Sequence, residues 1–345
     1  MKKLTTLVFT TTLLLLNSAT AQQIIKDKPT PSRAEGAPLG QAYGRDYSTT
    51  DVTKVVVIGS GTPTADPRHG GISVAVIVNG QTYIIDCGPG FWRASQANTP
   101  AFGGKFTALE PTNLTRLFLT HLHFDHTEGL AEFMLAPWTF KRGHPPQVYG
   151  PPGTADMVSN LMKAYTKDIY VQMFGLERTN ATGWRFLAHE VLPGEIYNDK
   201  NVRITAYQNK HGSWDYSYAF RVVTYKPDGS VDRTIAFSGD TSPFEGEDEA
   251  YAGADILFHE AYSYDPKTNK YDAEAPVSIP YMNSFHTSTE QLAALLKKVK
   301  PKLAVVYHYV VFTPANATDE ERSVKEIKKF GYDGLVIQSQ DCDVF

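Results

Sequence analysis

The sequence contains little cysteine, with only Cys87 and Cys342 among 345 residues. Two cysteines cannot build the disulfide framework that stabilises small secreted domains. Their spacing does not show whether they are close in space, so a bond between them stays open, and Cys87 is interpreted as a small buried hydrophobic residue. Hydrophobic residues make up 42% of the chain, so the fold can depend on a large apolar core instead.

Long hydrophobic runs are also scarce, and the one clear example lies at the N-terminus, in residues 4–16. It follows Lys2 and Lys3 and precedes the small residues 19–21, which together are the three parts of a secretory signal. The run is too short to span a bilayer comfortably, and no cysteine follows the cleavage site to carry a lipid. We therefore expect a periplasmic or secreted protein without membrane insertion.

This leader divides the chain into three predicted parts. Residues 1–21 form the signal peptide, and residues 22–50, which are rich in Pro, Gly, Lys and Thr, form an irregular N-terminal extension. No obvious linker interrupts residues 51–345, so we predict a single catalytic domain there.

An excess of basic residues is missing as well. The chain has 33 Lys and Arg against 37 Asp and Glu, for a net charge of −4. Loss of residues 1–21 removes two lysines and no acids, which makes the mature chain −6. Proteins that bind nucleic acids usually carry a basic face. The composition therefore argues against a nucleic-acid partner. We expect a small-molecule anionic ester as the substrate and no nucleic acid, and a homo-oligomer is compatible with the sequence.

Short β-rich runs alternate with helical patterns along the rest of the chain. Strands are expected near 54–58, 72–78, 81–86, 116–120, 202–208, 218–224, 233–237, 255–258, 303–307 and 334–337. Helices are expected near 128–136, 153–166, 288–299 and 318–330, the third of them behind a capping box from Thr287 to Glu290. The segment 137–183 is expected to pack over one rim. This interleaving indicates an α/β fold, with sheets covered by helices.

The stretch LFLTHLHFDHTEGL contains the densest group of metal-ligating residues. An apolar run, residues 117–119, is followed at once by His121, His123, Asp125 and His126. Alternate residues of an extended backbone point the same way, so His121 and His123 can hold one cation. Asp125 and His126 project elsewhere and suit a second cation close by.

Three further residues occupy comparable places at the ends of apolar strands. His211 follows VRITAYQ, Asp240 follows RTIAF, and His308 follows KLAVVY. A single His or Asp at a strand end is usually a solvated turn residue. In α/β folds, however, active sites gather at the carboxyl ends of strands, so we expect these three side chains to join the cluster.

These segments resemble the metallo-β-lactamase superfamily of binuclear hydrolases, and within it the ribonuclease Z-like branch. The motifs that carry the resemblance are GSGTP (59–63), HGGIS (69–73), IIDCGPG (84–90), THLHFDHTEGL (120–130), KHG (210–212), FSGDT (237–241), ILFHEAY (256–262), FHTS (285–288) and VVYHY (305–309). The resemblance implies an αββα sandwich of two mixed β-sheets with outer helices and metals at one edge.

The resemblance also implies a ligand set for two zinc ions, although iron or manganese fits the same ligand types. It assigns one ion to His121, His123 and His211, and the other to Asp125, His126 and His308, with Asp240 as a bridge. Because lactamases of the superfamily generally lack that bridge, an antibiotic-hydrolysing role loses weight.

Two further motifs imply a catalytic apparatus. By resemblance, His286 protonates the leaving group, Glu260 orients His286, and Asp125 helps to orient the attacking water. A hydroxide shared by the metals would be the nucleophile, and an imidazolium paired with a carboxylate has a raised pKa, as a general acid requires. His259 is interpreted as a packing residue.

The expected substrate is an aryl sulfate ester, which makes the protein an exported arylsulfatase. Only 28 residues separate His211 from Asp240, enough for one hairpin but not for the RNA-binding arm of many ribonuclease Z proteins. Aromatic residues near the motifs suit an aryl group: Trp92, Trp138, Phe140, Trp214, Tyr216, Tyr262, Tyr264, Tyr309 and Phe312. The alternatives are a phosphodiesterase, including one for cyclic nucleotides, a lactonase or thioesterase, and a metal-binding protein without catalysis.

Overall fold

The computed structural model describes residues 44–345 except for 65, 67, 264–278 and 311–320. The predicted signal peptide at 1–21 and most of the predicted extension at 22–50 lie outside the described residues. The end of the extension packs on the domain, because the Tyr47 backbone N–H donates to the Val344 carbonyl and the Tyr47 ring stacks on Phe345. The division of the chain into three parts stays a prediction.

The first half of the chain forms a six-stranded mixed sheet in sequential order. Its strands are β1 (Thr53–Gly59), β2 (Ser73–Val78), β3 (Gln81–Ile85), β4 (Arg116–Phe118), β5 (Gln147–Gly150) and β6 (Leu187–Glu190). The first three strands pair antiparallel and the remaining pairs, from β3 to β6, are parallel. Strand β2 is buried along its whole length, as expected for a central strand that is covered on both faces.

The second half forms a seven-stranded mixed sheet in reverse order, from β13 to β7. Its strands are β7 (Gly194–Asn198), β8 (Val202–Gln208), β9 (Tyr218–Tyr225), β10 (Val231–Phe237), β11 (Ile256–Tyr262), β12 (Leu303–Val310) and β13 (Val336–Gln338). Strands β7 to β10 pair antiparallel, and β10 to β13 pair parallel. Strands β9 and β10 form the single hairpin that was predicted between His211 and Asp240.

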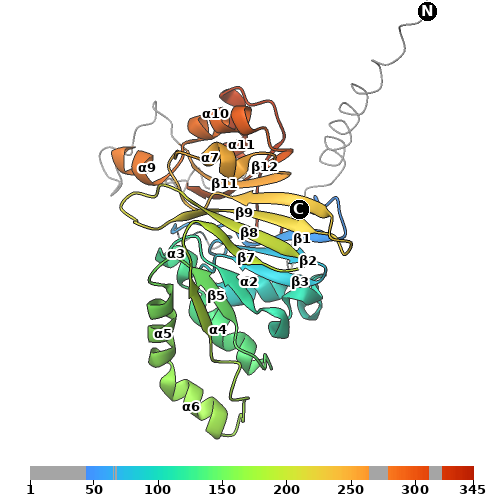
Figure 1. The fold of residues 1–345 in the computed structure, drawn as a ribbon, viewed down its shortest axis with the longest axis vertical. Coiled ribbons are helices and arrows are strands. Elements are labelled where there is room, and N and C mark those ends of the chain that lie inside the picture. Colours follow the sequence, from blue (N-terminus) through green and yellow to red (C-terminus); the bar gives the residue numbers. More distant parts are fainter. Residues whose placement is uncertain (1–43, 65, 67, 264–278, 311–320) are drawn as a thin grey trace, which may run out of the picture.

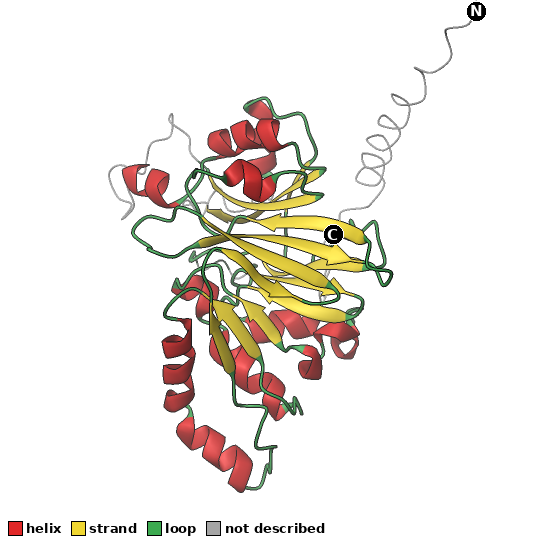
Figure 2. Cartoon of the chain, in the orientation of Figure 1, coloured by secondary structure: helices red, strands yellow, loops and turns green. Residues whose placement is uncertain are grey.

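The two sheets pack face to face, with helices on both outer surfaces (Figure 2). Alternate residues of β1 show the layering: Val55 and Val57 belong to the core between the sheets, whereas Val56 and Ile58 belong to the core under the helices. The first sheet is covered by α2 (Phe91–Ala97), α4 (Leu130–Thr139) and α5 (Thr154–Ala164). The second is covered by α7 (Glu247–Tyr251), α10 (Thr289–Val299) and α11 (Arg322–Lys329). The predicted αββα sandwich is confirmed.

Several predicted elements differ from those observed. The segment 137–183 does not only cover a rim, since it supplies β5 and then α5 and α6 (Thr166–Phe174), which extend beyond the sheets in Figure 1. Strands β5, β6 and β7 were not predicted; β6 and β7 contain no buried residue, so they lack an apolar pattern. The capping box of α10 is formed by Ser288 and Gln291, one residue later than predicted.

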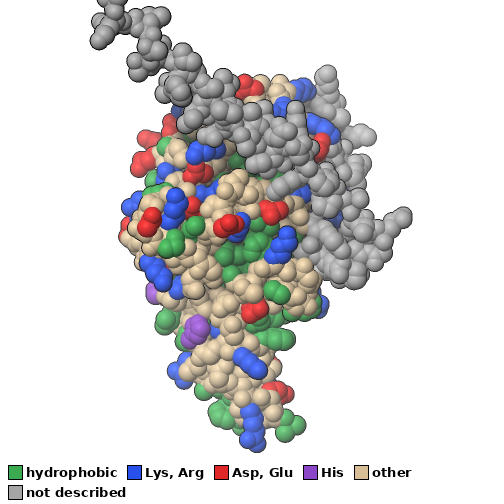
Figure 3. All heavy atoms as spheres, turned by 90° about the vertical axis from the view of Figure 1, so that its right-hand side faces the viewer, with side chains coloured by type: hydrophobic (Ala, Val, Ile, Leu, Met, Phe, Trp, Pro, Cys, Tyr) green, Lys and Arg blue, Asp and Glu red, His purple; other side chains and the backbone are tan. Residues whose placement is uncertain are grey.

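The surface carries charges of both signs. On the face shown in Figure 3, Lys and Arg side chains are interspersed with Asp and Glu side chains. Within the described residues, no helix combines the length and hydrophobicity needed to cross a bilayer.

Candidate metal centre

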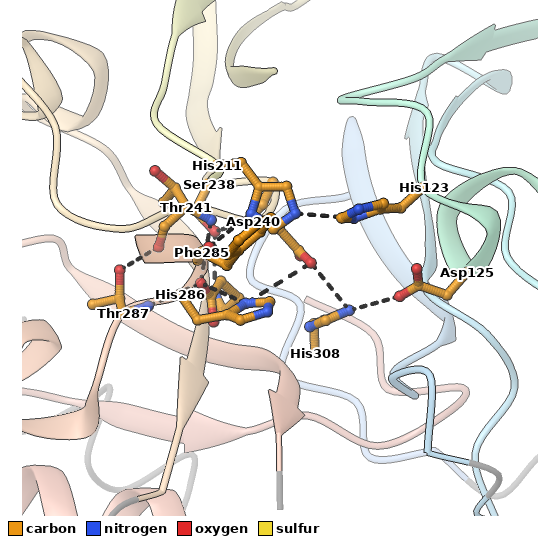
Figure 4. A network of polar contacts seen from close by, with 12 residues as sticks. His123, Asp125, His211, Ser238, Asp240, Thr241, Phe285, His286, Thr287 and His308 are labelled. Carbon is orange, nitrogen blue, oxygen red and sulfur yellow. Dashed lines mark hydrogen bonds and ion pairs between the residues drawn. The ribbon is translucent and has the colours of Figure 1, made fainter. Parts of the chain in front are cut away.

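The predicted ligands converge at one edge of the sandwich from five places in the chain. His121 and His123 follow β4, Asp125 and His126 lie in the short helix α3 (Phe124–Thr127), and the other three come from the second sheet. His211 lies in the loop after β8, Asp240 follows β10, and His308 is near the end of β12. Figure 4 shows five of these side chains pointing toward one another.

Their ligand atoms form two groups that share one carboxylate. The first group is His121, His123, His211 and Asp240; the second is Asp125, His126, Asp240 and His308. Within each group the ligand atoms all lie within 4.8 Å of one another. The structure therefore brings together all seven residues that were predicted to hold metals, and Asp240 is common to both groups.

Hydrogen bonds behind two of the histidines fix the nitrogen that faces the site. The His211 Nδ1–H donates to the Phe285 carbonyl at 2.7 Å, and the His126 Nδ1–H donates to Asp86 Oδ2 at 2.9 Å. In each ring Nδ1 carries the proton of this hydrogen bond, and Nε2 is the nitrogen whose lone pair would face a cation. A histidine that ligates a metal is normally held in this way.

Asp86 also fixes His121, through Thr120. The Thr120 backbone N–H donates to Asp86 Oδ1 and its hydroxyl donates to Asp86 Oδ2, both at 2.8 Å. The Thr120 oxygen can then accept the Nδ1–H of His121, which lies 3.1 Å away, and this leaves Nε2 of His121 free. A single buried carboxylate therefore orients ligands of both groups.

Buried atoms without a hydrogen bond mark the centre of the second group. His126 Nε2 and Asp240 Oδ1 are buried and make no hydrogen bond within the described residues, although they lie 3.3 Å apart. On the other side of the same group, His308 Nε2 lies 3.1 Å from Asp125 Oδ2 and 3.5 Å from Asp240 Oδ2. Unpartnered polar atoms are costly in a protein interior, and a cation between them removes that cost. The donor set therefore fits a divalent metal.

The protonation states also suit cations. Burial raises the pKa of Asp240, but His308 and His126 outweigh it and hold that pKa well below the usual value, so the carboxyl is ionised. Burial lowers the pKa of His121 well below its usual value, so its imidazole is neutral. Burial also acts to lower the pKa of His126, but Asp240, Asp86 and Asp125 outweigh it and raise that pKa well above its usual value, so a cation would have to displace a proton from that ring. Ionised carboxylates and neutral imidazoles are the forms that bind metals.

His123 differs from His126 and His211 because the nitrogen that points away from the site, Nε2, accepts a hydrogen bond instead of donating one. Its Nδ1 lies 3.1 Å from His121 Nε2 and 3.0 Å from His211 Nε2, whereas its Nε2 accepts the indole N–H of Trp214 at 2.7 Å. An indole N–H can only donate, so the imidazole proton is on Nδ1, between the other two rings. A cation held by this nitrogen would displace that proton.

The predicted proton donor, His286, lies beside Asp240 (Figure 4), and Glu260 is its nearest carboxylate partner. His286 Nδ1 is 3.3 Å from Glu260 Oε1 and 3.9 Å from Asp240 Oδ2. Glu260 is fully buried in β11, and its Oε1 also accepts the backbone N–H groups of Thr241 and Thr287. Burial lowers the pKa of His286, but the negative charge of Glu260 outweighs it. Together with Asp240 and Asp125, Glu260 raises this pKa to about 9.

Two buried polar residues of the site, Asp86 and His308, have a positive φ, which the sequence did not predict. Asp86 has a φ of 57° and His308 a φ of 47°, conformations that cost a non-glycine residue about 1–3 kcal/mol. His308 sits where β12 has two residues opposite one of β11, a bulge that turns its side chain toward the site. Asp86 was missed, although it follows an apolar strand just as the predicted ligands do.

Other predicted residues lie outside the centre. His259 is buried, donates from Nδ1 to the Glu260 carbonyl and packs against Tyr251, which confirms its interpretation as a packing residue. Cys87 and Cys342 are free and buried, so they are not joined in this structure.

Curated relatives and solved structures were found by comparison. The ribonuclease Z of Mycobacterium marinum is 29% identical over 275 residues, which are 79% of this chain and 91% of the relative. The metallo-β-lactamase fold protein YhfI of Bacillus subtilis has a TM-score of 0.61 at 17% identity, covering 86% of this chain and 99% of that one. The short form of human tRNase Z has a TM-score of 0.60 at 20% identity, covering 85% and 98%. These structural matches show the fold.

The relatives contradict the predicted arylsulfatase activity, because they are named as ribonucleases. The structure gives a physical reason for the error. Of the aromatic residues expected to form an aryl-binding wall, Trp138 is buried in the core, and Trp92 packs against Phe140. Tyr264 and Phe312 lie outside the described residues. Proximity to a motif in sequence was therefore only a partial guide, since Trp214, which donates to His123, does lie at the site.

The prediction that no nucleic acid is a partner is also contradicted by these relatives. That prediction rested on a net charge of −4 for the whole chain. A whole-chain sum leaves out bound cations, which are often the largest local charges in a site. The field that a polyanionic substrate meets depends on those cations more than on distant surface carboxylates.

A family model described as the β-lactamase superfamily domain matches residues 81–309, which include every predicted ligand and both His286 and Glu260. The fold and the paired ligand groups agree with that match. The chain therefore belongs to the metallo-β-lactamase superfamily of metal-dependent hydrolases.

Proposed function

We propose that the protein is a metal-dependent phosphodiesterase whose substrate is RNA. The observation that carries the proposal is the position of His286 and Glu260 beside a carboxylate that two groups of metal-ligating residues share. This arrangement suits a reaction in which a negatively charged centre is attacked and a basic oxygen leaves. The names of the curated relatives support RNA as the class of substrate.

We propose two zinc ions as the cofactor. His121, His123 and His211 would hold one, Asp125, His126 and His308 the other, and Asp240 would bridge them. When bound, such ions supply a water of lowered pKa and neutralise negative charge on phosphoryl oxygens.

The chain itself contributes proton transfer and positioning. His286 would donate the proton on its Nε2 to the departing oxygen, while its Nδ1–H stays bonded to Glu260. Glu260 is held by the two backbone N–H donors of Thr241 and Thr287, so the imidazole has little freedom to turn. Asp125 would accept a hydrogen bond from the attacking water as well as ligating a cation. An imidazolium is needed because the alkoxide that leaves from RNA is strongly basic.

The short hairpin between His211 and Asp240 excludes RNA contacts by a long arm inserted there. Strands β9 and β10 are joined by a short turn around Asp228 and Gly229, which leaves no room for a protruding arm. Contacts to RNA outside the metal centre would therefore come from segments other than this hairpin. We propose a short single-stranded segment as the substrate.

The test uses the protein loaded with zinc and the same protein stripped by a chelator. An end-labelled single-stranded RNA and bis(p-nitrophenyl) phosphate should both be cleaved by the zinc form and not by the stripped form. Addition of zinc should restore the lost activity. A zinc form that contains the metal by elemental analysis but cleaves neither diester would refute the proposal. Cleavage of cyclic nucleotides with RNA left intact would support the phosphodiesterase activity but refute RNA as the substrate.

A further inference from the structure

A cavity of about 190 Å³ lies beside the candidate metal centre. Its apolar walls are Leu122, Pro151, Pro152, Trp214 and Tyr216. Sites that enclose a drug-sized ligand have volumes of roughly 300–1,000 Å³. This cavity is smaller, so it suits one planar ring system and not an entire nucleotide.

The cavity is built by the same loops that supply the metal ligands. Leu122 lies between His121 and His123 after β4, and the two prolines follow the neighbouring strand β5. Trp214 and Tyr216 belong to the loop between β8 and β9, which also carries His211. A group in the cavity would thus be next to a phosphate at the metals.

Trp214 forms a wall that the cavity shares with the metal centre. Its indole N–H donates to His123 at 2.7 Å, and the two ring centroids are 4.9 Å apart in an edge-to-face arrangement. The Trp214 backbone N–H also donates to the His211 carbonyl, which ties the loop back on itself. The backbone bond to His211 does not involve the ring nitrogens of His123, so it holds the wall in place with or without a cation.

We propose that this cavity is a subsite for one nucleobase of the substrate. The inference rests on the proposed phosphodiesterase function and adds a recognition element to it. Nucleobases stack on aromatic side chains whatever their sequence, and the Trp214 and Tyr216 rings offer such surfaces. The proline and leucine side chains complete a wall that excludes water from the faces of the base.

Asp215 gives the subsite a preference among bases. Asp215 lines the cavity and is exposed, and its carbonyl accepts from Gln208 Nε2 at 3.3 Å. A carboxylate repels a polyanion unless it accepts hydrogen bonds from it. The amino groups of guanine, adenine and cytosine can donate to it, whereas uracil presents carbonyl oxygens on both sides of its one N–H.

The experiment measures binding and not turnover, by titration calorimetry of the zinc-loaded protein. The probes are guanosine 5′-monophosphate, uridine 5′-monophosphate and ribose 5-phosphate, which share a phosphate but differ in the base. We expect the guanosine nucleotide to bind about tenfold or more tightly than ribose 5-phosphate, and the uridine nucleotide to fall between them.

Two variants away from the ligands test the walls. Tyr216→Ala should reduce the preference for guanosine nucleotide over ribose 5-phosphate to about twofold. Tyr165→Ala is the matched control, since Tyr165 is exposed to 40% and Tyr216 to 39%, and Tyr165 does not line the cavity; it should keep the full preference. Asp215→Asn should reduce the difference in binding affinity between the guanosine and uridine nucleotides.

The outcomes separate the two proposals. If all three probes bind equally, or if Tyr216→Ala keeps the full preference, the nucleobase subsite is wrong even when diesters are cleaved. If the preference for a base is present in the wild type and lost in Tyr216→Ala, the subsite stands, although absent diester cleavage would then reject the phosphodiesterase.

Discussion

The Nδ1 atom of His286 lies 3.3 Å from Oε1 of the fully buried Glu260, on the side of the metal centre where Asp240 joins its two ligand groups. The carboxylate keeps the imidazole charged and oriented, so a proton is ready at the opposite nitrogen. The first two predictions follow from this pair.

Replacement of His286 should affect substrates according to the basicity of their leaving groups. In the variant His286→Ala, we expect kcat for RNA to fall by about 10²–10⁴-fold, the usual contribution of a general acid. For bis(p-nitrophenyl) phosphate the loss should be much smaller, because p-nitrophenolate leaves without protonation. His144→Ala, a change at an exposed histidine, should leave both rates unchanged. Equal losses for the two substrates would rule out a proton-donor role.

The alkaline limb of the pH–rate profile should follow the pKa of His286. The proton donor is present below this pKa, which Glu260 raises to about 9 despite burial, and is lost as the pH rises through it. Bound cations lower this value by their positive charge. Glu260→Gln removes the negative partner, so the limb should move down by about 1–3 pH units, the range for an opposite charge within ~4–6 Å. An unmoved limb in this variant would show that another group controls it.

Loss of the shared carboxylate should release metal from both positions. We expect Asp240→Ala to bind fewer than two zinc ions per chain by elemental analysis and to lose cleavage of both diesters. The control is Asp333→Ala, at an exposed aspartate far along the chain, which should keep the wild-type metal content. Wild-type zinc content in Asp240→Ala would contradict the bridging role.

Metal binding should be visible in the fluorescence of Trp214. If His123 coordinates through Nδ1, its Nε2 carries the proton, and the indole N–H of Trp214 loses its acceptor. Zinc added to metal-free protein should therefore change the tryptophan emission. The change should largely disappear in Trp214→Phe and persist in Trp92→Phe. A full change in Trp214→Phe would show that the emission change does not come from this hydrogen bond.

Export from the cytoplasm remains a proposal that rests on residues 1–21 alone. We expect protein produced in a Gram-negative host to be recovered outside the cytoplasm with Gln22 as its first residue, as measured by fractionation and mass spectrometry. The change Leu14→Arg interrupts the apolar segment and should leave the full chain in the cytoplasm. Recovery of unprocessed wild-type chain from the cytoplasm would be evidence against export.

Much of the fold could be predicted from local patterns. Both ends of strand β8 were predicted correctly. Apolar and polar residues alternate in its sequence, and the alternate residues are buried in the structure. Strands β6 and β7 were missed because their residues are exposed or half-buried, so pairing with neighbouring strands and not an apolar pattern defines them. The capping box was misplaced by one residue because the Thr287 hydroxyl donates to the Thr241 carbonyl, a tertiary contact.

The sequence by itself determined the residue types of the metal centre and their places at strand ends, since both follow from spacing along one chain. Only the tertiary structure decided how they act together. The bulge that turns His308 inward, the inward lone pairs set by Asp86, and the cavity beside Trp214 all arise where segments far apart in sequence meet. Such contacts depend on the packing of two sheets against each other, which no local pattern specifies.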